Sequence, residues 1–235
     1  MASRYETAWE SFWSDLPETA GEAIWDTDPE RTAAMHLPLF EPYFDPALPL
    51  LDLGCGNGTQ TRFLAGRSAR VIGVDVSASA LALARKANPA PNIAYQQMDL
   101  LDSAATAALH QAVGDANIYM RGVVHQLGPR DWPAAASGLA MLTGQRGHLF
   151  DLELAPVEQS LPRAGDLPPN LARVFQHGIT PAGLGPGDLQ ALLVNAGFEI
   201  LDSGEITDPS TQPLPDGSHT SHYMQYVVAR VRPGI

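Results

Sequence analysis

From about residue 48 onward, short apolar runs alternate with segments whose apolar positions recur at helical spacing. The runs are rich in β-branched residues, as is typical of strands that are buried on both faces. We predict strands over residues 49–53, 69–75, 93–98, 117–124, 147–154, 198–206 and 221–231. Helical patterns lie between the first five, and another covers residues 188–196. This alternation predicts an α/β protein with a parallel sheet and crossover helices.

Two segments lie outside this alternation. Near the start, Trp9, Phe12, Trp13 and Leu16 fall on one helical face. They predict a helix that docks on the core, and the same helix is suited to be a lid, because sheets of this kind bind ligands at the carboxyl ends of their strands. Residues 155–187 contain six prolines and five glycines and are predicted to cross the surface.

Charge and composition exclude several classes of protein. The chain has 14 basic and 26 acidic residues, so its net charge of −12 disfavours nucleic acids and anionic membranes as partners. The only lysine, Lys86, follows no glycine loop, which excludes a P-loop site. The single cysteine excludes an intrachain disulfide. With no basic, apolar leader and no run of about 20 apolar residues, a cytoplasmic protein is expected.

The stretch LDLGCGNG at residues 51–58 carries most of the chemical information. Gly54, Gly56 and Gly58 follow a strand and directly precede a helix, where glycine allows a tight turn and the close approach of a ligand. Asp75 ends the second predicted strand, where a carboxylate can accept both hydroxyls of a ribose. The pattern therefore predicts a nucleoside cofactor.

The glycine spacing discriminates between nucleoside cofactors. Dinucleotide-binding loops prefer G-x-G-x-x-G, but Thr59 occupies the position of their third glycine. Asp52, two residues before the loop, would repel a pyrophosphate and tolerate a sulfonium cofactor that carries an ammonium group. A nicotinamide-dependent oxidoreductase is therefore the less favoured alternative.

With Asp52 before the glycine loop, Asp75 at the end of strand two and Asp99 after strand three, the chain resembles the class I S-adenosylmethionine (SAM)-dependent methyltransferases over about residues 48–154 and 186–232. The resemblance implies a Rossmann-like, mostly parallel seven-stranded sheet with an antiparallel last strand and helices on both faces. We expect one domain, with a lid (1–45), a cofactor-binding half (46–154), an excursion over the substrate site (155–187) and a final helix with two strands (188–235). The candidate cofactor-binding residues are Asp52, Gly54, Cys55, Gly56, Asp75, Val76, Met98, Asp99, Leu100 and Arg121.

Methyl transfer to a hydroxyl requires a group that takes up the acceptor's proton. In RGVVHQL (121–127), His125 is the candidate base, and the alternative is a histidine that hydrogen-bonds the backbone. Arg121 either contacts the cofactor carboxylate or an acidic substrate, or it pairs with a surplus acid. No metal site is expected: His219 and His222 have no further ligand nearby, and Asp151 and Glu153 complete no acidic set. The candidate substrate-contacting residues are Trp9, Trp13, Trp25 and Tyr223, with Trp25 alternatively a core anchor.

We therefore expect a methyltransferase that acts on a small molecule, most simply on a hydroxyl group. Thiol or amine acceptors, and a protein that keeps the cofactor site without methylating, remain alternatives, because fold and cofactor loop do not fix the chemistry. A monomer or a homodimer is expected.

Overall fold

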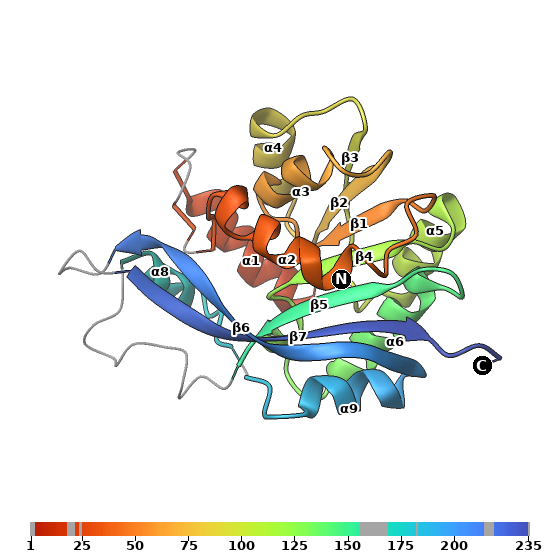
Figure 1. The fold of residues 1–235 in the computed structure, drawn as a ribbon. Helices are drawn as coiled ribbons and strands as arrows, with labels where there is room; N and C mark the ends of the chain where they lie inside the picture. The colour runs from red at the N-terminus through yellow and green to blue at the C-terminus, as the bar shows by residue number, and fades with distance from the viewer. Residues whose placement is uncertain are drawn as a thin grey trace.

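The computed structural model describes residues 3–17, 22–23, 25–155, 169–181, 183–213 and 219–234. One seven-stranded sheet crosses the molecule in the order β3-β2-β1-β4-β5-β7-β6 (Figure 1). The first five strands pair in parallel, and β7 is antiparallel to both β5 and β6. This confirms the predicted fold class. The strands are β1 (Leu50–Leu53), β2 (Val71–Asp75), β3 (Ile93–Gln97), β4 (Asn117–Arg121), β5 (Leu149–Leu154), β6 (Phe198–Pro213) and β7 (His219–Val231).

Helices cover both faces of the sheet, because both faces of the central strands are apolar. Leu109, Leu139 and Leu189 bring α5, α6 and α9 onto one face. Phe40 and Leu64 bring α2 and α3 onto the other. The α-helices are α1 (Arg4–Asp15), α2 (Ala33–Phe40), α3 (Thr59–Leu64), α4 (Ala78–Ala87), α5 (Ser103–Val113), α6 (Trp132–Thr143), α8 (Pro169–Gln176) and α9 (Asp188–Asn195). In the described part of the chain, no helix has the length and apolar character needed to span a membrane.

The strand β4 is shorter than predicted. The sequence pattern extended it to Val124, but it ends at Arg121. Gly122 has φ +74°, a left-handed conformation that ends the strand, and a 3₁₀ turn, η2 (Val124–Gln126), follows. His125 therefore lies on this turn and not on the strand.

The described part of residues 155–187, which we predict to cross the surface, also packs against the N-terminal helix. It includes α8, and Val174 and Ile179 are buried together with Phe12 and Trp13 of α1. Apolar positions spaced for a helix were hidden among the prolines and glycines of this segment. Residues 156–168 and 182 lie outside the described residues.

The last two strands extend further than predicted and form a long antiparallel hairpin. Its outer part pairs Thr207 with Tyr223 and Asp208 with His222, beyond the last residue of β5. This length brings Asp208 to the end of β4, next to the cleft described below.

Candidate active site

A cleft opens at the carboxyl ends of the parallel strands β1, β2 and β4, where sheets of this topology bind ligands. Two carboxyl side chains, Asp75 and Asp99, contribute to an otherwise largely apolar wall. The predicted cofactor residues Gly54, Gly56, Asp75, Val76, Met98, Asp99 and Leu100 all line this cleft, together with Tyr5, Trp9, Trp13, Leu53, Val74, Leu101, Gly122, Val123, Gln126 and Leu127.

The glycine loop lies directly under the aromatic face of α1. Gly56 has φ +53°, and a Cβ added to it would lie 2.8 Å from Cζ2 of Trp13. Glycine is therefore needed here both for the backbone conformation and for the contact with the indole. Trp13, a predicted substrate residue, covers the loop and is only 5% exposed.

The Asp75 carboxylate is built into the turn around the cleft. Its Oδ2 accepts the Gly56 N–H at 2.8 Å and its Oδ1 accepts the Ser77 N–H at 2.9 Å. Burial raises the pKa of Asp75 to about 6, against the lowering effect of these backbone hydrogen bonds. Each oxygen keeps a lone pair for a further donor.

Three other predicted cofactor residues lie beside a smaller cavity behind the loop, which Asp52, Cys55 and Arg121 line together with Trp25. Asp52 accepts a hydrogen bond from Thr61 Oγ1 at 2.5 Å, and burial raises its pKa to about 7. Burial also raises the pKa of the Cys55 thiol well above its ordinary value, which favours a packing role for this side chain.

The helix α1 is attached to the protein at both ends of the cleft. Glu10 accepts hydrogen bonds from Ser77 Oγ at 2.7 Å and from Ser79 N–H at 3.0 Å, directly after Asp75. Tyr5 Oη donates to Asp131 at 2.6 Å, at the start of α6, and accepts the Gly128 N–H at 2.7 Å. These contacts hold the N-terminal helix over the cleft.

His125 is held by a buried carboxylate. Its Nδ1 lies 2.5 Å from Glu153 Oε2, and the same carboxylate accepts the backbone N–H groups of Val123, Val124 and His125 at 3.0, 2.8 and 2.9 Å. His125 Nε2 lies 2.7 Å from Nε2 of Gln126. Gln126 lines the cleft and His125 does not, so a role of His125 as a base stays a prediction.

A second buried acid, Asp151, lies close to Glu153 and shifts the protonation of the pair. Asp151, two residues earlier on β5, is fully buried. Burial and the nearby Glu153 raise the pKa of Asp151 well above its ordinary value. Burial also opposes ionisation of Glu153, but contact with His125 holds the Glu153 pKa below its ordinary value. The pair therefore carries its negative charge on Glu153, beside the imidazole. Within the described residues, no cluster of three potential metal ligands forms.

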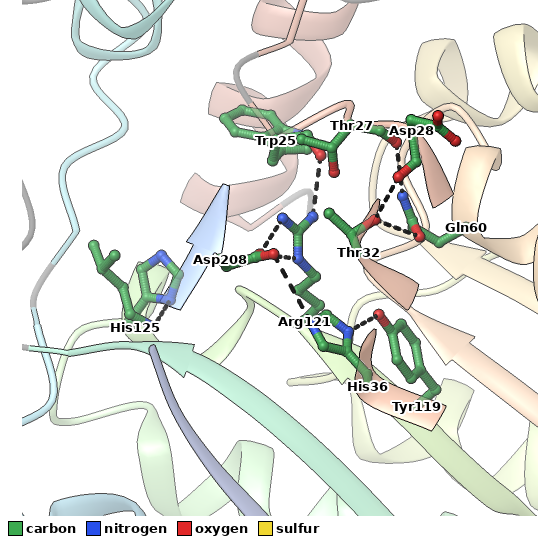
Figure 2. Close-up of polar contacts among 11 residues, drawn as sticks. Trp25, Thr27, Asp28, Thr32, His36, Gln60, Tyr119, Arg121, His125 and Asp208 are labelled. Carbon is green, nitrogen blue, oxygen red and sulfur yellow. Dashed lines mark hydrogen bonds and ion pairs between the residues drawn. The ribbon is translucent and has the colours of Figure 1, made fainter. Parts of the chain in front are cut away.

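Arg121 pairs with an acid, as one of its two predicted roles required (Figure 2). Its Nε donates to Asp208 at 2.9 Å and its Nη1 donates to the Trp25 carbonyl at 3.0 Å. His36 lies next to this pair, with Nδ1 2.9 Å from Tyr119 Oη, and burial lowers the pKa of His36 to about 4. A contact of Arg121 with a cofactor carboxylate stays a prediction.

The three remaining substrate candidates lie in different places. Trp9 lines the cleft and packs edge-to-face on Trp25, with ring centroids 5.5 Å apart. Trp25 itself belongs to the aromatic cluster around Phe12, which fits the anchor alternative. Tyr223 is 52% exposed on β7 and lines neither the cleft nor the cavity behind the loop.

Comparisons with known proteins identify the family. Residues 50–147 match the methyltransferase domain family. A solved structure of a SAM-dependent methyltransferase from Anabaena variabilis ATCC 29413 is 37% identical and has a TM-score of 0.88, with 97% of this chain and 95% of that chain covered. The chain belongs to the SAM-dependent methyltransferases. SAM is accordingly the methyltransferase's cofactor.

Two further proteins are similar to the methyltransferase, one over a short stretch and the other at low sequence identity. Trans-aconitate 2-methyltransferase from Azoarcus sp. (strain BH72) is 44% identical over 73 residues, which cover 30% of this chain and only 28% of that protein. A TehB-like SAM-dependent methyltransferase from Corynebacterium glutamicum ATCC 13032 Kitasato is 17% identical, with a TM-score of 0.54 and 97% and 96% of the two chains covered. At this identity the second likeness shows the fold alone.

Proposed function

We propose that the methyltransferase transfers the methyl group of SAM to a hydroxyl oxygen of a small molecule. The observation that carries this proposal is the His125–Glu153 pair, with 2.5 Å between Nδ1 and Oε2, directly behind the wall of the cofactor cleft. The net charge of −12 argues against a nucleic-acid substrate.

The residues of the cleft fit SAM. The free lone pairs of Asp75 suit the two ribose hydroxyls, and the apolar side chains of Met98 and Leu100 suit the faces of an adenine. Asp52 adds a carboxyl group at the small cavity behind the glycine loop, and this group would suit the ammonium group of SAM. When bound, SAM supplies a methyl group on a positively charged sulfur. The protein itself must position the acceptor, exclude water and remove one proton.

The His125–Glu153 pair would remove that proton. With the proton on Nδ1, facing the Glu153 carboxylate, the lone pair on Nε2 would be the proton acceptor. The acceptor's O–H bond breaks as its new O–CH₃ bond forms. The proton goes to His125 Nε2, and the electron pair of the broken S–CH₃ bond stays on the sulfur.

The test uses SAM with an isotopically labelled methyl group and a panel of small hydroxyl, thiol, amine and carboxylate compounds. We expect label in hydroxyl compounds, and a rate about 10²–10⁴-fold lower in His125→Gln with nearly unchanged affinity for S-adenosylhomocysteine. His110→Gln is the matched control, because His110 pairs with Asp115 away from the cleft. A near-wild-type rate of His125→Gln would exclude the base and favour thiol or amine acceptors. No labelled product from any compound would favour a protein that does not methylate.

A carboxylate is a second candidate acceptor. The partial match to trans-aconitate 2-methyltransferase points to it, because aconitate is a tricarboxylate. A carboxylate is ionised at neutral pH and needs no base. Label in carboxylates, at a rate that His125→Gln leaves unchanged, would favour this acceptor.

A further inference from the structure

A second cavity, of about 310 Å³, adjoins the cofactor cleft. Tyr5, Trp9 and Gln126 line both spaces, and Ile179 extends the apolar wall of the second cavity. The volume lies at the lower end of the range of small-molecule sites. The position is suitable for a methyl acceptor, because the two ligands would meet at the shared residues.

The charges around this cavity are already balanced. Arg4 reaches it, but its guanidinium lies 3.0 Å from the Asp131 carboxylate and also contacts the Tyr5 hydroxyl. Thr180 adds one neutral polar group. The cavity therefore favours a neutral ligand over an anion, and the aromatic side chains of Tyr5 and Trp9 in its wall suit a flat ring.

Gln126 stands at the junction of the two spaces and covers the candidate base. Its Nε2 lies 2.7 Å from Nε2 of His125. In the tautomer of the proposed function, with the proton on Nδ1, the Gln126 amide N–H donates to the lone pair on Nε2, and this orients the amide. Its Oε1 then points away, buried and without a hydrogen-bond partner among the described residues. A buried carbonyl oxygen without a donor is unfavourable, so within the described residues the hydrogen bond to His125 is the contact that favours this position of the amide.

We propose that the second cavity binds a flat, neutral, largely apolar acceptor that carries a ring hydroxyl, and that this hydroxyl replaces the Gln126 amide at His125 Nε2. The inference rests on the proposed function and deepens it. The hydroxyl donates to the same lone pair that the amide occupies, so one hydrogen bond is exchanged for another. Gln126 is thus a gate over the base and not a residue that holds the acceptor.

The direction in which Gln126→Ala changes the affinity for an acceptor separates these two roles. As probes we choose 2-naphthol and 2-methoxynaphthalene, which share a ring system but differ in the O–H donor, titrated into the complex with S-adenosylhomocysteine. We expect 2-naphthol to bind wild type at least about tenfold more tightly, since a site that hydrogen-bonds a hydroxyl discriminates against the compound lacking it. Gln126→Ala should bind 2-naphthol several-fold more tightly than wild type, because no amide has to be displaced; both proteins are saturated with S-adenosylhomocysteine before the titration.

Gln190→Ala is the matched control, because Gln190 on α9 also has a buried Oε1 without a partner in the described structure and lines neither space. Weaker 2-naphthol binding by Gln126→Ala would mean that Gln126 holds the acceptor, and would overturn the inference. The inference would also be overturned if wild type bound the two naphthalenes equally tightly, or if it bound neither of them. Methyl transfer to other hydroxyl compounds would then leave the proposed function standing, whereas failure of wild type to bind S-adenosylhomocysteine would contradict the proposed function itself.

Discussion

Replacing Asp75 by alanine should weaken cofactor binding more than it weakens the fold. Both oxygens of Asp75 already accept one backbone N–H, from Gly56 at 2.8 Å and from Ser77 at 2.9 Å, and each has one lone pair left for a ribose hydroxyl. Without the carboxylate, two hydroxyls lose their acceptor in a largely apolar cleft. We expect a loss of about 1–3 kcal/mol of binding free energy, or roughly 5- to 150-fold in the dissociation constant.

Isothermal titration of SAM into Asp75→Ala and wild type measures this loss. Asp115→Ala is a matched control, because Asp115 also accepts two backbone N–H groups, from Gln145 at 3.0 Å and Arg146 at 3.1 Å, but lies just before the amino end of β4, whereas the cleft lies at the carboxyl ends of the strands. Both variants lose backbone hydrogen bonds, so only the effect specific to Asp75 reports on the cofactor. Wild-type affinity in Asp75→Ala would refute the assignment of the ribose to β2, and an equal loss in both variants would indicate general destabilisation.

Three further predictions concern the lid, the pH and the buried ion pair. Trp13→Ala, which uncovers the glycine loop, should weaken SAM binding in the same titration, and unchanged affinity would contradict a lid. SAM affinity should rise between pH 5 and 7, because burial raises the pKa of Asp75 to about 6 and only the ionised carboxylate accepts both hydroxyls; a flat profile would contradict this. Asp208→Asn leaves Arg121 without its buried counter-ion and should cost about 3–5 kcal/mol of unfolding free energy in denaturant titrations. Glu199→Gln, which breaks an exposed pair with Arg230, should cost less than about 1 kcal/mol, and equal costs would refute the reasoning.

The sequence predicts the parts of this structure that depend on neighbouring residues. The glycine loop and Asp75 are both set by local backbone requirements, so the cofactor cleft follows from the pattern. The end of β4 was misplaced because the apolar run continues past Gly122, whose positive φ no periodicity reveals. The helix α8 was missed because its apolar residues pack on α1 and not on the main core.

The remaining features depend on contacts between distant residues. Glu10 and Ser77 are 67 positions apart, and Arg121 and Asp208 are 87 apart, so their pairing exists only once the sheet and hairpin have formed. Gln126 was next to a predicted site residue in the chain, but a glutamine beside a histidine gives no signal by itself. Its position at the junction of the two cavities comes from the η2 turn.

A crystal structure of the complex with S-adenosylhomocysteine tests the central claim most directly. The account predicts the ribose hydroxyls within hydrogen-bond distance of Asp75, the adenine beside Met98 and Leu100, and the sulfur facing the space that Gln126 lines. The molecule bound elsewhere, or bound with its sulfur directed away from Gln126, would contradict it.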